Sequence, residues 1–86
     1  MKTLTSTELP VELEGFAGGM GYMSIASITE SDLGFDSDLD VKGYISEPID
    51  GVYYAEVLSE CTENYACGTI DEMKKWLTDT VFSVCE

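Results

Sequence analysis

The stretch GTIDEMKKWLTDTVFSV, residues 68–84, indicates structure more strongly than any other part of the chain. Thr69 and Glu72 match the capping box of a helix N-terminus, and Asp71 places an acid in the first turn, where the helix dipole favours negative charge. Apolar residues follow at helical spacing, and these are Ile70, Met73, Leu77, Val81 and Val84. The sequence therefore predicts a C-terminal helix with one apolar face, which must pack against another element.

Four segments before this helix alternate between apolar and polar residues, as half-buried strands do. They are residues 8–16, 22–28, 41–48 and 52–58. Pro10 makes the first segment either an edge strand or a short helical start. A turn at Gly18-Gly19 would join the first segment antiparallel to the second, and Asp50-Gly51 is a hairpin turn between the third and the fourth.

Between the second and third segments, residues 29–40 are rich in Asp, Ser and Gly and lack a sustained period. They predict an acidic loop that holds a helical turn at residues 30–33. The order of elements predicts an α+β fold, with residues 1–86 forming a single domain. We expect a small antiparallel sheet of about four strands packed against one C-terminal helix. The sheet face without the helix would then be free to hold acids and tyrosines.

Charge is the abnormal property of this chain. Seventeen acids stand against four lysines, with no arginine and no histidine, so the net charge is −13. Phosphate backbones and anionic membranes would both repel such a surface, so neither nucleic acid nor a membrane is an expected partner. The N-terminal residues lack the apolar stretch of a secretory signal, which favours a cytoplasmic location.

Catalysis is not expected. Without histidine the chain has no Ser-His-Asp or Cys-His arrangement, and its serines have no evident activating base. No glycine-rich phosphate loop opens a helix, so no cofactor is expected. Cys61, Cys67 and Cys85 are an odd number without paired metal-ligand spacing, which favours free thiols over a disulfide framework or a zinc site.

The acidic loop contains the main candidates for binding. Asp36, Asp38 and Asp40 alternate, and in an extended segment their carboxylates would lie about 6.6 Å apart on one face. That interval approximates the phosphate spacing of a nucleic-acid strand. Glu12 and Glu14 on the first strand, and Glu56 and Glu60 on the fourth, would extend the row. The predicted partner-binding residues are Glu30, Asp32, Asp36, Asp38, Asp40, Glu47 and Asp50, with Tyr44 as an aromatic anchor.

The same loop resembles the calcium loop of the EF-hand family, with acids at loop positions 1, 3, 5 and 12, which are Asp36, Asp38, Asp40 and Glu47. It departs from that pattern at position 6, where the family has glycine, and at position 8, where the family has an apolar residue. No metal is therefore expected, and a calcium-binding module is a lesser alternative.

In size and charge the chain resembles small acidic inhibitors encoded by phages and mobile elements, such as anti-CRISPR and antirestriction proteins. This resemblance, which rests on composition, implies an inhibitor that mimics nucleic-acid phosphates. Its partner would be a basic nucleic-acid-binding protein, for example a CRISPR effector complex or a restriction enzyme in a bacterial host's cytoplasm. The alternative is a non-catalytic adaptor that docks through the apolar margin around Trp76 and Phe82. Mimic binding should weaken steeply with salt, and apolar docking should not.

Overall fold

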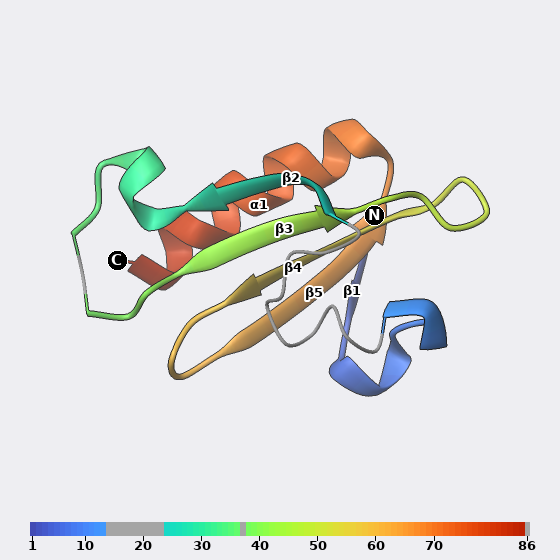
Figure 1. Cartoon of the computed structure of the whole chain (residues 1–86), viewed down its shortest axis with the longest axis horizontal. Coiled ribbons are helices and arrows are strands. Elements are labelled where there is room, and N and C mark those ends of the chain that lie inside the picture. Colours follow the sequence, from blue (N-terminus) through green and yellow to red (C-terminus); the bar gives the residue numbers. More distant parts are fainter. Residues whose placement is uncertain (14–23, 37, 86) are drawn as a thin grey trace.

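The computed structural model describes residues 1–13, 24–36 and 38–85. These residues form an antiparallel sheet and a long C-terminal helix (Figure 1). The strands are β1 (Lys2–Leu4), β2 (Ser24–Thr29), β3 (Lys42–Ser46), β4 (Tyr53–Leu58) and β5 (Glu63–Gly68), and the helix is α1 (Ile70–Cys85). Short 3-10 turns are η1 (Ser6–Glu8), η2 (Val11–Leu13) and η4 (Glu30–Leu33).

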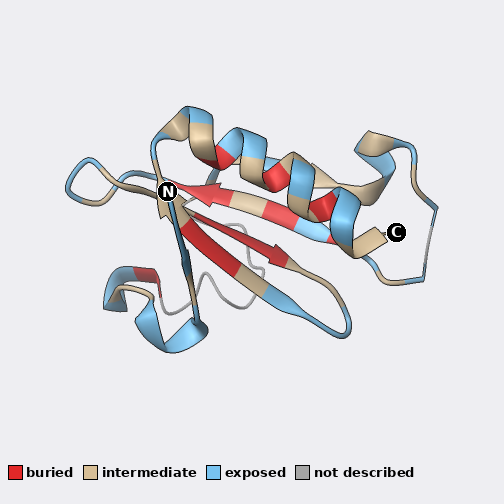
Figure 2. Cartoon of the chain, turned by 180° about the vertical axis from the view of Figure 1, so that it is seen from behind, coloured by how far each residue is buried: buried red, intermediate tan, exposed pale blue. Residues whose placement is uncertain are grey.

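The described strands form one five-stranded sheet in the order β1-β5-β4-β3-β2, with every neighbouring pair antiparallel. Helix α1 crosses one face of this sheet, and its buried residues lie on the side turned to the strands (Figure 2). The buried core between these two layers consists of Val41, Ile45, Ala55, Val57, Ala66, Met73, Leu77 and Val81. The predicted α+β fold is thus confirmed, with five strands rather than about four.

The predicted helix N-terminus is confirmed in detail. The Glu72 N–H donates to Thr69 Oγ1 at 3.2 Å, and the Thr69 N–H donates to Glu72 Oε1 at 3.0 Å. Glu72 also forms an ion pair with the amino group of Met1, at 3.2 Å, which ties β1 to the start of the helix. The Thr69 N–H, followed by this amino group, holds the pKa of the Glu72 carboxyl below its ordinary value. One side chain therefore caps the helix and holds the first strand.

Two other local predictions are also confirmed. Asp50 and Gly51 both have positive φ, 51° and 80°, as two-residue hairpin turns require. On either side of them, Ile49 and Val52 exchange two backbone hydrogen bonds of 2.9 and 3.0 Å. Residues 30–33 form the expected helical turn, η4.

The strand predicted from residue 8 onwards is wrong over the described residues. Residues 6–8 and 11–13 form 3-10 turns instead, as the alternative of a short helical start anticipated. Pro10 has no N–H for a strand ladder, and its carbonyl oxygen accepts from the Leu13 N–H at 2.9 Å. The second predicted strand therefore pairs with β3 rather than with the first. The predicted Gly18-Gly19 turn lies outside the described residues.

Candidate functional site

The structure brings seven acids to one end of the sheet, which we call the acidic end. Thr29, the last residue of β2, pairs with Lys42, the first residue of β3. Lys42 also pairs with Leu58, the last residue of β4, and Leu58 pairs with Glu63, the first residue of β5. The η4–β3 segment and the β4–β5 turn therefore emerge together, on the left in Figure 1. The acids at the acidic end are Glu30, Asp32, Asp36, Asp38, Asp40, Glu60 and Glu63.

A direct hydrogen bond joins the two segments. The Glu60 N–H donates to the Leu39 carbonyl oxygen at 3.1 Å, and the Leu39 side chain packs against the core. The backbone of Glu60 is thereby held beside Leu39, although Glu60 lies about twenty residues further along the chain. Lys42 is the one lysine that the described residues place at this end, so the acids greatly outnumber the bases there.

Some of these acids have structural partners. Asp32 Oδ2 accepts from the Thr29 N–H at 2.8 Å and caps η4, which matches its place in a capping box. Asp40 forms an ion pair of 3.6 Å with Lys42. Glu63 Oε2 accepts from the Tyr65 hydroxyl at 3.2 Å. These three carboxylates thus stabilise the end as well as charging it.

Glu30 ties the acidic end to α1. The Cys85 thiol donates to Glu30 Oε2 at 3.8 Å, and burial together with the charge of Glu30 raises the pKa of this thiol. Nearby, the rings of Phe35 and Phe82 meet edge to face with centroids 5.1 Å apart. The last turn of α1 therefore anchors η4 and the start of the acidic loop.

The remaining acids of this end face solvent. Asp36, Asp38 and Glu60 are exposed, and their carboxylates form no hydrogen bond or ion pair with another described residue. They do not form the extended row expected from the sequence, because residues 38–39 make a turn and Asp40 has a φ of 50°. The carboxylates are instead spread over two loops, so the regular interval between alternate residues of a strand does not apply to them.

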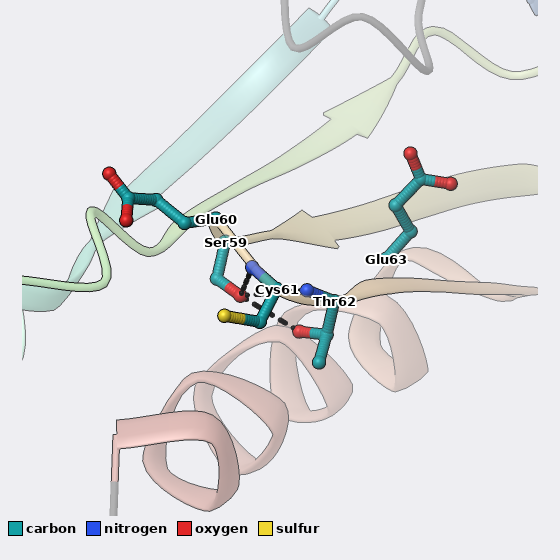
Figure 3. Close-up of a pocket in the computed structure, with 5 residues that line it drawn as sticks. All are labelled: Ser59, Glu60, Cys61, Thr62 and Glu63. Carbon is teal, nitrogen blue, oxygen red and sulfur yellow. Dashed lines mark hydrogen bonds between the residues drawn. The ribbon is translucent and has the colours of Figure 1, made fainter.

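The turn between β4 and β5 is shaped by its own side chains (Figure 3). Ser59 Oγ accepts hydrogen bonds from the N–H groups of Cys61 and Thr62, at 3.3 and 3.1 Å. This hydroxyl therefore stabilises the backbone of the turn. Residues 59–63 line an open hollow of about 380 Å³ at this turn. The side chains of Glu60 and Glu63 extend away from it in different directions. This arrangement favours electrostatic contact with a large partner over enclosure of a small ligand.

Three of the predicted binding residues lie away from the acidic end. Glu47 and Asp50 belong to the β3–β4 hairpin at the opposite end of a molecule 36 Å long. Tyr44 lies in the middle of β3, half-buried, between the cross-strand neighbours Ser27 and Glu56. The structure therefore gathers five of the eight predicted residues, and Glu60 and Glu63 join them.

Glu56 corrects another expectation. Its alternation in β4 predicted an exposed carboxylate, but the residue is fully buried on the sheet face opposite α1. Its neighbour Tyr65 is 3% exposed, and burial, followed by the charge of Glu63, raises the pKa of Tyr65 to about 12. The middle of this face is therefore not the open acidic surface that the sequence suggested.

Across the described ranges 1–13, 24–36 and 38–85, no three Cys, Asp or Glu residues gather as ligands for a metal ion. The three cysteines are free thiols. None of the described helices is long and apolar enough to cross a membrane. Comparisons with protein-family models, with curated proteins and with solved structures gave no match.

Proposed function

We propose that this protein is a non-catalytic inhibitor whose acidic end occupies the nucleic-acid groove of a basic partner. The main support is the junction of two acidic loops, fixed by the hydrogen bond between Glu60 and Leu39. It presents seven carboxylates beside one lysine. A basic groove normally meets phosphates at such a density of negative charge, and complementary charge accelerates encounter and selects the partner.

The proposed partner handles DNA or RNA in a bacterial cytoplasm, as a CRISPR effector complex or a restriction enzyme does. The inhibitor itself would be encoded by a phage or another mobile element. In this mechanism the carboxylates compete with nucleic acid for the same lysines and arginines, and no bond is made or broken. Competing DNA and added salt should therefore both release the complex.

The first experiment is capture of partners from a bacterial lysate with the tagged protein, followed by reconstitution of the captured complex from purified components. The decisive variant replaces the three solvent-facing acids, as Asp36→Asn, Asp38→Asn and Glu60→Gln. Because exposed ion pairs contribute about 0.2–1 kcal/mol each, the loss of three should lower the affinity roughly threefold to a hundredfold. The folded state should persist, since these side chains have no described hydrogen-bond partner.

A matched control removes the same charge elsewhere. Glu12→Gln, Glu47→Gln and Asp50→Asn together neutralise three exposed acids outside the acidic end. Both triple variants have a net charge of −10, which is −13 plus three. If the acidic end is the contact surface, the control should keep its affinity within about twofold, because distant charges are screened beyond about 10 Å. An equal loss of affinity in the two variants would show that binding depends on net charge alone.

The adaptor alternative has its own structural support. Trp76, half-buried, lines a mainly apolar hollow of about 310 Å³ with Met1, Glu72, Lys75 and Asp79. Phe82, 41% exposed, lies on the same helix but packs against Phe35. A partner held at this hollow should be insensitive to salt and to DNA. It should be lost on Trp76→Ala, whereas the acidic-end variant should retain it.

A further inference from the structure

The two edges of the sheet are protected to different degrees. β1, at one edge, has only three residues and begins with Lys2, and it leads into two 3-10 turns. β2, at the other edge, has six residues, SIASIT, without a charge or a proline. Natural proteins usually protect an exposed edge with a charge, a proline or a very short strand, because its unpaired backbone groups attract other strands. Within the described ranges, β2 pairs with β3 alone.

The hydrogen-bond pattern shows which backbone groups of β2 face outward. The Glu30 N–H donates to the Val41 carbonyl oxygen at 3.1 Å, so residues 30 and 41 are hydrogen-bonded across the ladder. Hydrogen-bonded and non-hydrogen-bonded pairs alternate in antiparallel sheets. Thr29 and Lys42 therefore form a non-hydrogen-bonded pair, and so do Ser27 and Tyr44. It follows that Ser27 and Thr29 direct their N–H and C=O groups away from β3.

Both ends of this edge are closed. The Thr29 N–H is accepted by Asp32 Oδ2 at 2.8 Å, as expected for a group that points outward. At the other end the register shifts between Ser24 and Ala26, so Ile25 bulges and is 49% exposed. The open part is therefore central. It offers the N–H and C=O of Ser27, beside the exposed Ser27 side chain.

We propose that this edge accepts an extended, cationic segment of the partner as a sixth strand. The proposal rests on the proposed function, since the cationic partner is the one inferred for the acidic end. β2 is uncharged, whereas Glu30 and Asp32 follow directly after it. An incoming strand can thus make backbone bonds at Ser27 while its lysines or arginines reach these carboxylates. A second copy of this chain is a poorer occupant because it would add a further charge of −13.

The test uses a capped hexapeptide of alternating lysine and valine and ¹⁵N-labelled full-length protein. In the free protein the Ser27 amide should exchange fast, and those of Ala26 and Ile28 slowly. Millimolar peptide should slow Ser27 exchange at least about tenfold, a typical effect of a new backbone hydrogen bond. The control peptide has the same charge but methylated backbone nitrogens, so it should leave the Ser27 rate unchanged.

Variants of the protein give a second readout. Ser27→Pro removes the outward N–H without removing a bond to β3, and it should weaken peptide binding at least about fivefold. Ser27→Ala retains the N–H and should bind as the wild type does. An unaltered Ser27 amide with the unmethylated peptide, or equal binding of both peptides, would overturn the proposal. Pairing of β2 with a second copy, seen as a peptide-independent dimer, would overturn it too.

The two proposals can fail separately. If both peptides perturb only the acidic end, the strand-addition proposal fails while the acidic end remains a cation-binding surface. If the unmethylated peptide protects Ser27 but no captured protein depends on Asp36, Asp38 and Glu60, the proposed inhibitor function fails and the strand site remains. The peptide experiment does not require the natural partner, so its outcome is independent of the lysate capture.

Discussion

At Gly43, in β3, the sheet packs closely against Leu77 of α1, and this contact offers a sharp test of the packing. A Cβ at residue 43 would lie 2.7 Å from Leu77 Cδ2, 3.1 Å from Ile28 Cγ2 and 3.3 Å from Val57 Cγ2. Real Cβ atoms essentially never come within 3.0 Å of a neighbour, so Gly43→Ala must displace the Leu77 side chain. Leu77 is only 4% exposed, which leaves it little room to move.

Two effects oppose each other in this variant. Overpacking a closely packed core costs about 1–3 kcal/mol. Replacing glycine by alanine in a strand recovers about 0.5–1 kcal/mol, because the unfolded chain loses backbone freedom. The net expectation is that Gly43→Ala lowers the free energy of unfolding by about 0.5–2 kcal/mol. For a domain of this size that corresponds to a fall in Tm of roughly 2–16 °C.

A double-mutant cycle isolates the contact. Leu77→Val alone removes one buried methylene and should cost about 1 kcal/mol. In the double variant the new methyl at residue 43 takes the space that Leu77 Cδ2 leaves. The double variant should therefore be destabilised by roughly 1 kcal/mol less than the sum of the two single variants. Urea unfolding, followed by circular dichroism and by the fluorescence of Trp76, the single tryptophan, measures all three variants.

Either of two results would refute this reasoning. A Gly43→Ala variant at least as stable as the wild type would mean that Leu77 moves without cost. Strict additivity of the two substitutions would mean that the atoms at 2.7 Å do not interact in solution. The contact also matters for the proposed function, because α1 packed at this distance brings its last turn against Glu30 and Phe35.

Two further predictions concern the helix cap and the buried tyrosine. Thr69→Ala should lower the free energy of unfolding by about 1 kcal/mol because the Glu72 N–H loses its acceptor, whereas Thr69→Ser should be nearly neutral in the same thermal melt. Equal Tm values for both variants would contradict the capping role. The pKa of Tyr65 is raised to about 12 from 10.0, so folding favours the protonated phenol. The stabilisation that Tyr65 provides is complete below pH 10 and is lost as the pH rises towards 12, and Tyr65→Phe should remove this part of the alkaline decline in urea unfolding. Identical declines in both proteins would show that Tyr65 is not its source.

Features encoded by neighbouring residues could be predicted from the sequence. The cap at Thr69 and Glu72, the hairpin turn at Asp50 and Gly51, and the helical turn η4 each depend on hydrogen bonds between residues at most four apart. The apolar spacing of α1 likewise identified Met73, Leu77 and Val81 as core residues. In each case a short segment contains both the donor and the acceptor, or the whole repeating pattern. The feature can therefore be predicted without knowledge of the fold.

Strands β1 and β5 were missed for a different reason. β1 has three residues, too few to show a period, and β5 contains Asn, Ala and Gly, which have low strand propensity. Their pairing, for example Thr3 with Ala66, joins segments from the two halves of the chain. Only the completed sheet supplies the neighbours that make these residues strands.

The fold class, the excess of acids and the acidic loop after β2 can all be predicted from the amino-acid sequence. The set of acids that share a surface depends on the tertiary structure. The tertiary structure brought Glu60 beside Leu39, moved Glu47 and Asp50 to the far end, and buried Glu56. It also placed β2 at an edge and turned the backbone of Ser27 outward. The physical reason is that charge and local hydrogen bonding are properties of short segments, whereas exposure and proximity depend on which distant strands pair.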